Sequence, residues 1–203
     1  MSIVLTTAPV AEPVTVDELK AHARIDQDSE DDLLAQYLKM ARKATETYLW
    51  RQLVSATYTL KIDRFPTEDY IDLPLPPLVS VTSVKYYDTS NTLQTFSSGS
   101  YTVDVGTEPG RIYVDRSVGW PSTYDRRNAV EIVFVAGYGL AAAVPDTIKV
   151  SIMQKAAHAF ENRETVVVGV SVSEIPQSAQ LLDDLMRFRG DLNINKYGLV
   201  GPR

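Results

Sequence analysis

Two residues of one predicted helix have a spacing that could hold a metal ion. His158 and Glu161 lie three positions apart, which presents two ligands on one helix face. A metal site needs a third ligand, and the only other histidine, His22, would have to come from a distant helix. We therefore favour packing or surface roles for these residues and expect no metal and no cofactor. A small metal-dependent hydrolase is kept as an alternative hypothesis.

An acidic run from Asp26 to Asp32 has the composition of a calcium-binding loop but not its spacing. An EF-hand loop that begins at Asp26 needs Gly at its sixth position and Glu at its twelfth, where the sequence has Asp31 and Tyr37. Acidic side chains at the start of a helix are stabilised by its dipole, so we interpret the run as a helix start. The sequence also lacks a Gly-x-Ser-x-Gly elbow. We predict that the chain is not an enzyme.

The composition restricts the class of protein further. The 203 residues carry a formal net charge of -6, opposite in sign to that of most proteins that grip nucleic acid. No run of 18 apolar residues occurs, so we expect no membrane span. The absence of Cys excludes disulfides and thiolate chemistry and suits a reducing cytoplasm, or a particle assembled inside one.

The order of periodicities predicts an α+β fold. Helical patterns occupy both ends of the sequence and should share one core, because neither group could bury its apolar stripe alone. We expect a helical core domain from residues 1–52 and 138–189, an antiparallel β-rich insertion over 53–137 and a tail over 190–203. The last helix, from about Gln177 to Phe188, should be buried through Leu181, Leu182, Leu185 and Met186.

Alternating apolar residues predict the strands of the insertion. The alternation runs from Val54 to Ile62 and recurs in several later segments, with a slip near Ser83 that indicates a bulge. Pro109 and Gly110 predict a hairpin turn at Glu108–Arg111. We interpret Leu73-Pro-Leu-Pro-Pro-Leu78 as a stiff connector between strands. A monomeric binding module that uses this proline-rich stretch is the other alternative hypothesis.

Two segments near the end of the sequence suggest contacts with other chains. Four alternating valines, Val166, Val168, Val170 and Val172, lie between two predicted helices, and a short apolar strand with a free edge tends to pair with another chain. Simple packing of this segment on its own domain is equally compatible with the pattern. From Arg187 onward the chain has four basic residues against Asp191 alone. Its scattered apolar residues suit a segment that a partner orders, and equally a disordered one.

The sequence resembles the head–tail adaptor (connector) family of long-tailed bacteriophages, in the subfamily with a β insertion. The resemblance extends from about Pro13 to Arg189 and depends on the order and spacing of several short motifs. These are Pro13–Asp26, Asp31–Leu34, Tyr48-Leu49, Leu73–Val84, Glu108–Ile112, Trp120-Pro121, Ala136–Gly139, Val144–Ile148 and His158–Glu164.

The resemblance implies a structural ring, usually of twelve copies, in the neck of a virion. Such a ring docks under the capsid portal, meets a stopper or tail-completion protein, and leaves a channel for DNA without sequence-specific binding. The family has no catalytic residues to carry over. Within this role we expect the four valines to form a contact between subunits. We expect the portal to contact the basic tail through Arg187, Arg189, Lys196, Tyr197 and Arg203.

Overall fold

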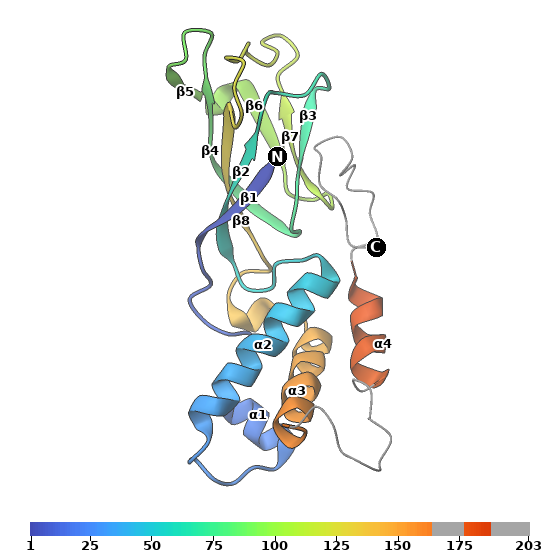
Figure 1. Ribbon diagram of the computed structural model, residues 1–203. Helices are drawn as coiled ribbons and strands as arrows, with labels where there is room; N and C mark the ends of the chain where they lie inside the picture. Colours follow the sequence, from blue (N-terminus) through green and yellow to red (C-terminus); the bar gives the residue numbers. More distant parts are fainter. Residues whose placement is uncertain (164–176, 188–203) are drawn as a thin grey trace. The chain divides into compact units, whose positions relative to one another are not determined.

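The computed structural model has an α+β fold and describes residues 1–163 and 177–187 (Figure 1). Contacts divide the chain into two compact units. A strand unit comprises Met1–Pro9 and Ser55–Tyr138, and a helical unit comprises Val10–Val54 with the described part of Gly139–Phe188. The predicted fold class, helices from both ends of the sequence with an antiparallel β-rich insertion, is confirmed. Within the described ranges, no helix is long and apolar enough to cross a membrane.

The helical unit contains four helices in the described residues: α1 (Val16–Ala23), α2 (Asp31–Leu49), α3 (Asp146–Glu161) and α4 (Gln177–Met186). α1 begins with a capping box, because the Glu18 N–H donates to Thr15 Oγ1 and the Thr15 N–H donates to the Glu18 carboxylate. α2 packs along α3 through one apolar stripe on each helix. The buried apolar residues of these two helices are Leu34, Leu38, Ala41, Leu49, Ile148, Ile152 and Ala156.

The predicted burial of α4 is wrong for two of its leucines. Leu181 is 67% exposed and Leu185 is 73% exposed, whereas Ala179 and Asp183 are buried. Residues two positions apart on a helix lie on nearly opposite faces, so the face that meets α3 is the one with Ala179 and Asp183. The apolar residues Leu181 and Leu185 therefore form a stripe on the surface of α4, not on its buried face.

The strand unit consists of two antiparallel sheets. The first has the order β1-β2-β8-β4-β5 and the second β3-β7-β6. Their bounds are β1 (Ser2–Thr7), β2 (Ala56–Ile62), β3 (Tyr70–Leu73), β4 (Leu78–Tyr87), β5 (Leu93–Phe96), β6 (Tyr101–Asp104), β7 (Gly110–Val114) and β8 (Val130–Ala136). The predicted bulge is confirmed as a register shift between Val81 and Ser83, and the predicted hairpin as the pairing of β6 with β7.

The first strand was not predicted. Residues 1–52 were all expected in the helical core, but β1 pairs with β2 at the edge of the five-stranded sheet, with Val4 opposite Thr59. Two features hid this strand from the sequence. Ile3-Val-Leu5 is a continuous apolar run that does not alternate, and its partner strand lies more than fifty residues further along the chain.

The two sheets share one apolar core, and a glycine permits a close contact within it. Both sheets contribute to one cluster of buried residues that includes Ile71, Ile112 and Phe134. A Cβ atom added at Gly110 on β7 would lie 2.3 Å from the Cβ of Leu78 on β4, so no side chain fits at Gly110. The proline-rich stretch connects β3 to β4, as predicted, and its Pro74 and Pro76 are buried.

Candidate interaction surface of the helical unit

The residues considered as metal ligands under the alternative hydrolase hypothesis lie on two different helices. His22 belongs to α1, while His158 and Glu161 belong to α3. Across residues 1–163 and 177–187, no three His, Asp or Glu side chains are grouped as metal ligands would be. His158 Nδ1 lies 3.3 Å from the amide nitrogen of Asn162, one turn further along the chain. The described part of the chain therefore gives no geometric support to the hydrolase hypothesis.

Most residues predicted to contact other chains lie outside the described residues. These are Val166, Val168, Val170, Val172, Arg189, Lys196, Tyr197 and Arg203. Arg187 is described, and its guanidinium carbon lies 4.7 Å from the centre of the Tyr48 ring on α2. The assignments of these residues to a subunit contact and a portal contact remain predictions.

A buried polar cluster, formed by Thr45, Ser151, Lys155 and Asp183, attaches α4 to α2 and α3. The Ser151 hydroxyl lies 2.6 Å from Asp183 Oδ1 and donates to it, and Lys155 Nζ forms an ion pair with Asp183. Lys155 Nζ also donates to Thr45 Oγ1 at 2.8 Å. Asp183 is only 3% exposed, and a carboxylate that is removed from water needs such partners.

Two further polar contacts attach α4 to the C-terminal end of α2 and to the segment that follows it. The Tyr48 hydroxyl donates to Asp184, and this hydrogen bond raises the pKa of Tyr48. Arg51 Nε donates to the Met186 carbonyl oxygen at 2.9 Å. Directional contacts on one side of α4 thus fix its rotation, and that rotation turns Leu181 and Leu185 to the surface.

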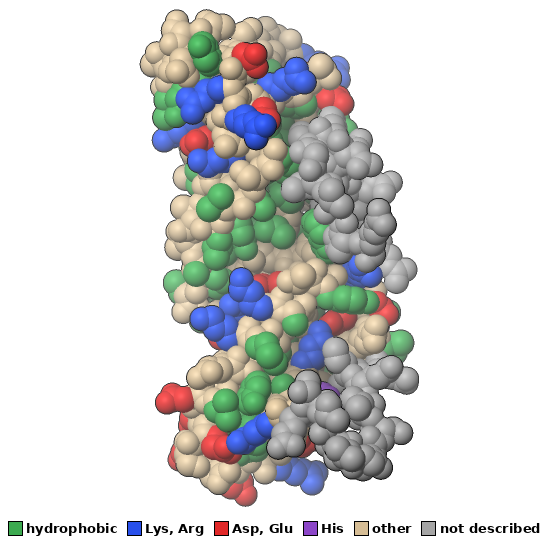
Figure 2. Space-filling view, in the orientation of Figure 1, with side chains coloured by type: hydrophobic (Ala, Val, Ile, Leu, Met, Phe, Trp, Pro, Cys, Tyr) green, Lys and Arg blue, Asp and Glu red, His purple; other side chains and the backbone are tan. Residues whose placement is uncertain are grey.

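A hollow of about 350 Å³ lies between α2, α3 and α4, next to the buried polar cluster. We call it the helical groove. Its lining is mainly apolar because α2 and α3 contribute small side chains there. The residues that line it include Met40, Ala44, Tyr48, Ala159 and Gln180. On the face drawn in Figure 2, hydrophobic side chains reach the surface over α2 and α4. The groove and the exposed leucines lie on different sides of α4, since Gln180 and Asp183 line the groove.

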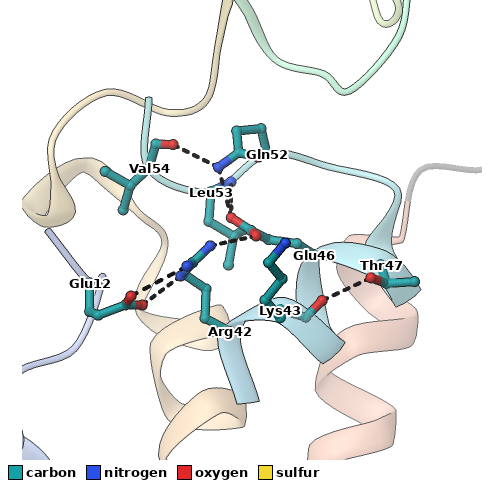
Figure 3. A network of polar contacts seen from close by, with 8 residues as sticks. All are labelled: Glu12, Arg42, Lys43, Glu46, Thr47, Gln52, Leu53 and Val54. Atoms are coloured by element: carbon teal, nitrogen blue, oxygen red, sulfur yellow. Dashed lines mark hydrogen bonds and ion pairs between the residues drawn. The ribbon is translucent and has the colours of Figure 1, made fainter. Parts of the chain in front are cut away.

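A second polar network, shown in Figure 3, also involves the C-terminal half of α2. Arg42 is buried and forms ion pairs with Glu12, from the segment before α1, and with Glu46, one turn further along α2. Glu46 also accepts from the side-chain amide of Gln52 at 2.8 Å and from the Leu53 N–H at 3.3 Å. Burial raises the pKa of Glu46, against the opposing effect of Arg42. The network thus joins the start and the end of Val10–Val54 to α2.

Only weak signals in the sequence indicate this surface. The exposed leucines were identified but were assigned to the core. The buried polar cluster was missed, although Asp183 stands four residues after Ala179, the spacing of neighbours on one helix face. The charged Asp183 on the same helix face as the small Ala179 could have indicated that this face packs against other helices. The partners of Asp183 on α2 and α3 could not be identified from the sequence.

Comparisons with known proteins agree with the predicted resemblance. The family model of phage gp6-like head-tail connector proteins matches residues 13–106. This match begins at Pro13, where the predicted resemblance begins, and confirms that resemblance over the matched residues. No curated protein sequence matches the chain.

Solved structures extend the likeness beyond the matched segment. A chain from the neck of an empty gene transfer agent (GTA) particle, computed with C6 symmetry, is 24% identical with a TM-score of 0.78. A chain from the virion of the native gene transfer agent particle is 23% identical with the same TM-score, and one from the native neck computed with C12 symmetry is 21% identical with a TM-score of 0.75. Each alignment covers 95% of this chain and 98% of the other chain. At these identities the likeness establishes a shared fold.

Proposed function

We propose that this protein is a structural, non-enzymatic member of the head–tail connector family that forms a ring in the neck of a phage-like particle. The observation that carries the proposal is the agreement of two comparisons. The connector family model matches residues 13–106, and the fold matches chains of particle necks over 95% of this chain. Fold alone does not determine function, but the two likenesses point to the same place in a particle.

The ring we propose has twelve copies and connects the capsid portal to a stopper or tail-completion protein. One of the similar neck structures was computed with C12 symmetry and another with C6, of which twelve is a multiple. The particle would assemble in the host cytoplasm. In this arrangement the helical unit, the strand unit that includes β1, and the tail of residues 190–203 would have separate contacts. The four valines from Val166 to Val172 would serve the subunit contact, and the basic residues from Arg187 to Arg203 the portal contact.

The acidic balance of the chain suits a DNA passage. DNA binding requires Lys and Arg side chains that displace condensed counterions from the phosphates. Each copy has 26 acidic and 20 basic residues, so a ring of copies has a strong negative charge. DNA would pass through such a ring without adhering to it and without sequence-specific binding.

Reconstitution with the portal protein of the same particle tests this proposal. The full-length chain is mixed with purified portal rings and imaged by electron microscopy. We expect a ring of this protein seated on one face of each portal. Portals that remain bare at saturating concentrations of the chain would reject the portal contact.

A further inference from the structure

The helical unit has an exposed apolar projection and an apolar hollow, and both lack an occupant among the described residues. The projection consists of Leu181 and Leu185, which follow each other at a spacing of four along α4 and form one stripe. Each is at least two-thirds exposed. The hollow is the helical groove, where Met40 is 51% exposed. Large apolar side chains at the surface of a folded chain carry an unfavourable hydration free energy that burial removes.

One copy cannot fill its own groove with these leucines. The groove contacts the side of α4 that carries Gln180 and Asp183. Leu181 and Leu185 lie two positions further along from Ala179 and Asp183, and therefore point away from the buried face of the same helix. The polar contacts of Asp183 and Asp184 prevent α4 from turning the leucines inward, because rotation would leave buried charges without partners.

The two surfaces match in chemical character. The leucine stripe has one uncharged neighbour, Ser178, and one charged neighbour, Asp184, three positions on either side of Leu181. The Asp184 carboxylate already accepts a hydrogen bond from the Tyr48 hydroxyl. The groove is mainly apolar; of its ionisable lining residues, Lys155 and Asp183 form an ion pair with each other, and the third is His158. Depletion of charge at the centre is what distinguishes protein interfaces from the rest of the surface. Association of the stripe with the groove would therefore bury apolar side chains without leaving a charge unpaired.

We propose that Leu181 and Leu185 of one copy insert into the helical groove of a second copy. The inference rests on the proposed ring, because it names the contact that would join neighbouring copies. A projection and a hollow at different places on one chain give a head-to-tail contact, which repeats from copy to copy and closes when the rotation per copy divides a full turn. A two-fold dimer, by contrast, would bring like surfaces together. The contact thus has the directionality that a ring requires.

Cysteine cross-linking tests the contact directly, because the natural chain has no Cys. Particles are prepared with Leu185→Cys and Ala44→Cys in the same chain, and the presence of the chain in isolated necks is verified before oxidation. Both positions are exposed, so the substitutions leave the core intact. Oxidation should join copies into a ladder of covalent multimers on a non-reducing gel. Either single substitution should leave at least tenfold less of the chain in multimers.

A matched pair controls for accidental proximity of exposed cysteines. Val118 is 57% exposed and belongs to the strand unit, so Leu185→Cys with Val118→Cys should give no ladder. A ladder from this control pair equal to that of the test pair would overturn the inference. An internal cross-link, seen as a faster-migrating single chain, would show that the groove is filled by its own copy and would also overturn it.

The remaining outcomes separate this inference from the proposed function. Necks that contain the chain but give no multimers would reject the leucine contact and leave the neck role intact. A product joined to a protein of different mass would assign the stripe to another partner. Particles whose necks lack the chain would reject both.

Discussion

Removal of the Asp183 carboxylate tests how α4 is attached to the helical unit. Asp183→Ala leaves the Lys155 ammonium, whose side chain is 14% exposed, without its anionic partner, and removes an acceptor from the Ser151 hydroxyl. Breaking a buried ion pair from one side costs about 3–5 kcal/mol, mainly because the remaining charge is uncompensated. We therefore expect Asp183→Ala to lower the free energy of unfolding of the helical unit by about 3–5 kcal/mol.

The two tryptophans allow this loss to be measured in one unit at a time. Trp50 follows α2 in the helical unit, and Trp120 lies in the strand unit, where its ring stacks on Phe65. In a Trp120→Phe background, fluorescence during urea unfolding reports on the helical unit alone. The double variant Lys155→Met with Asp183→Leu should recover most of the loss, since replacing both charges by apolar groups is often close to neutral. A single variant that loses less than about 1 kcal/mol, the cost of an ordinary hydrogen bond, would refute a buried-charge junction. A double variant that loses as much as the single would refute it equally.

Three further perturbations have expected outcomes. Gly110→Ala should destabilise the strand unit by about 1–3 kcal/mol through overpacking against Leu78, as read from Trp120 fluorescence on heating. Gly106→Ala, where an added Cβ has ordinary contacts, should not. Arg42→Ala should cost the helical unit about 3 kcal/mol in urea unfolding, because two carboxylates lose their cation. Equal stability of the natural chain and this variant would contradict the network. Burial raises the pKa of Glu46 in the folded state above its ordinary value. The stability that this shift contributes is complete below the ordinary pKa of the carboxyl and declines as the pH rises through the raised pKa. The stability difference between the natural chain and Glu46→Gln should shrink accordingly, and a difference that grows with pH would contradict the burial effect.

Much of the fold could be predicted because its signals are local. The capping box at Thr15 and Glu18, the apolar stripe of α2 and the alternation of β2 each lie within a short window, and each is present in the structure. β1 was missed because its pairing joins residues such as Val4 and Thr59, which are far apart in the sequence. Periodicity finds an apolar face but does not identify what covers it.

The leucines of α4 show the same limit at the candidate site. A stripe at a spacing of four predicts a buried helix face, and Leu181 and Leu185 satisfy that pattern. The structure buries Asp183 instead, because Ser151 and Lys155 from α3 supply partners that compensate a carboxylate. A sequence pattern cannot distinguish a face buried in the chain from one available to another chain.

We propose that copies of this protein form a ring in the neck of a phage-like particle. Electron microscopy of isolated particles, with the neck reconstructed at subnanometre resolution, tests it most directly. We expect a closed ring of subunits between portal and tail, each fitted by the helical and strand units as separate bodies, around an open axial channel. Complete particles whose necks contain no density for these units, together with absence of the chain from their protein content, would contradict it.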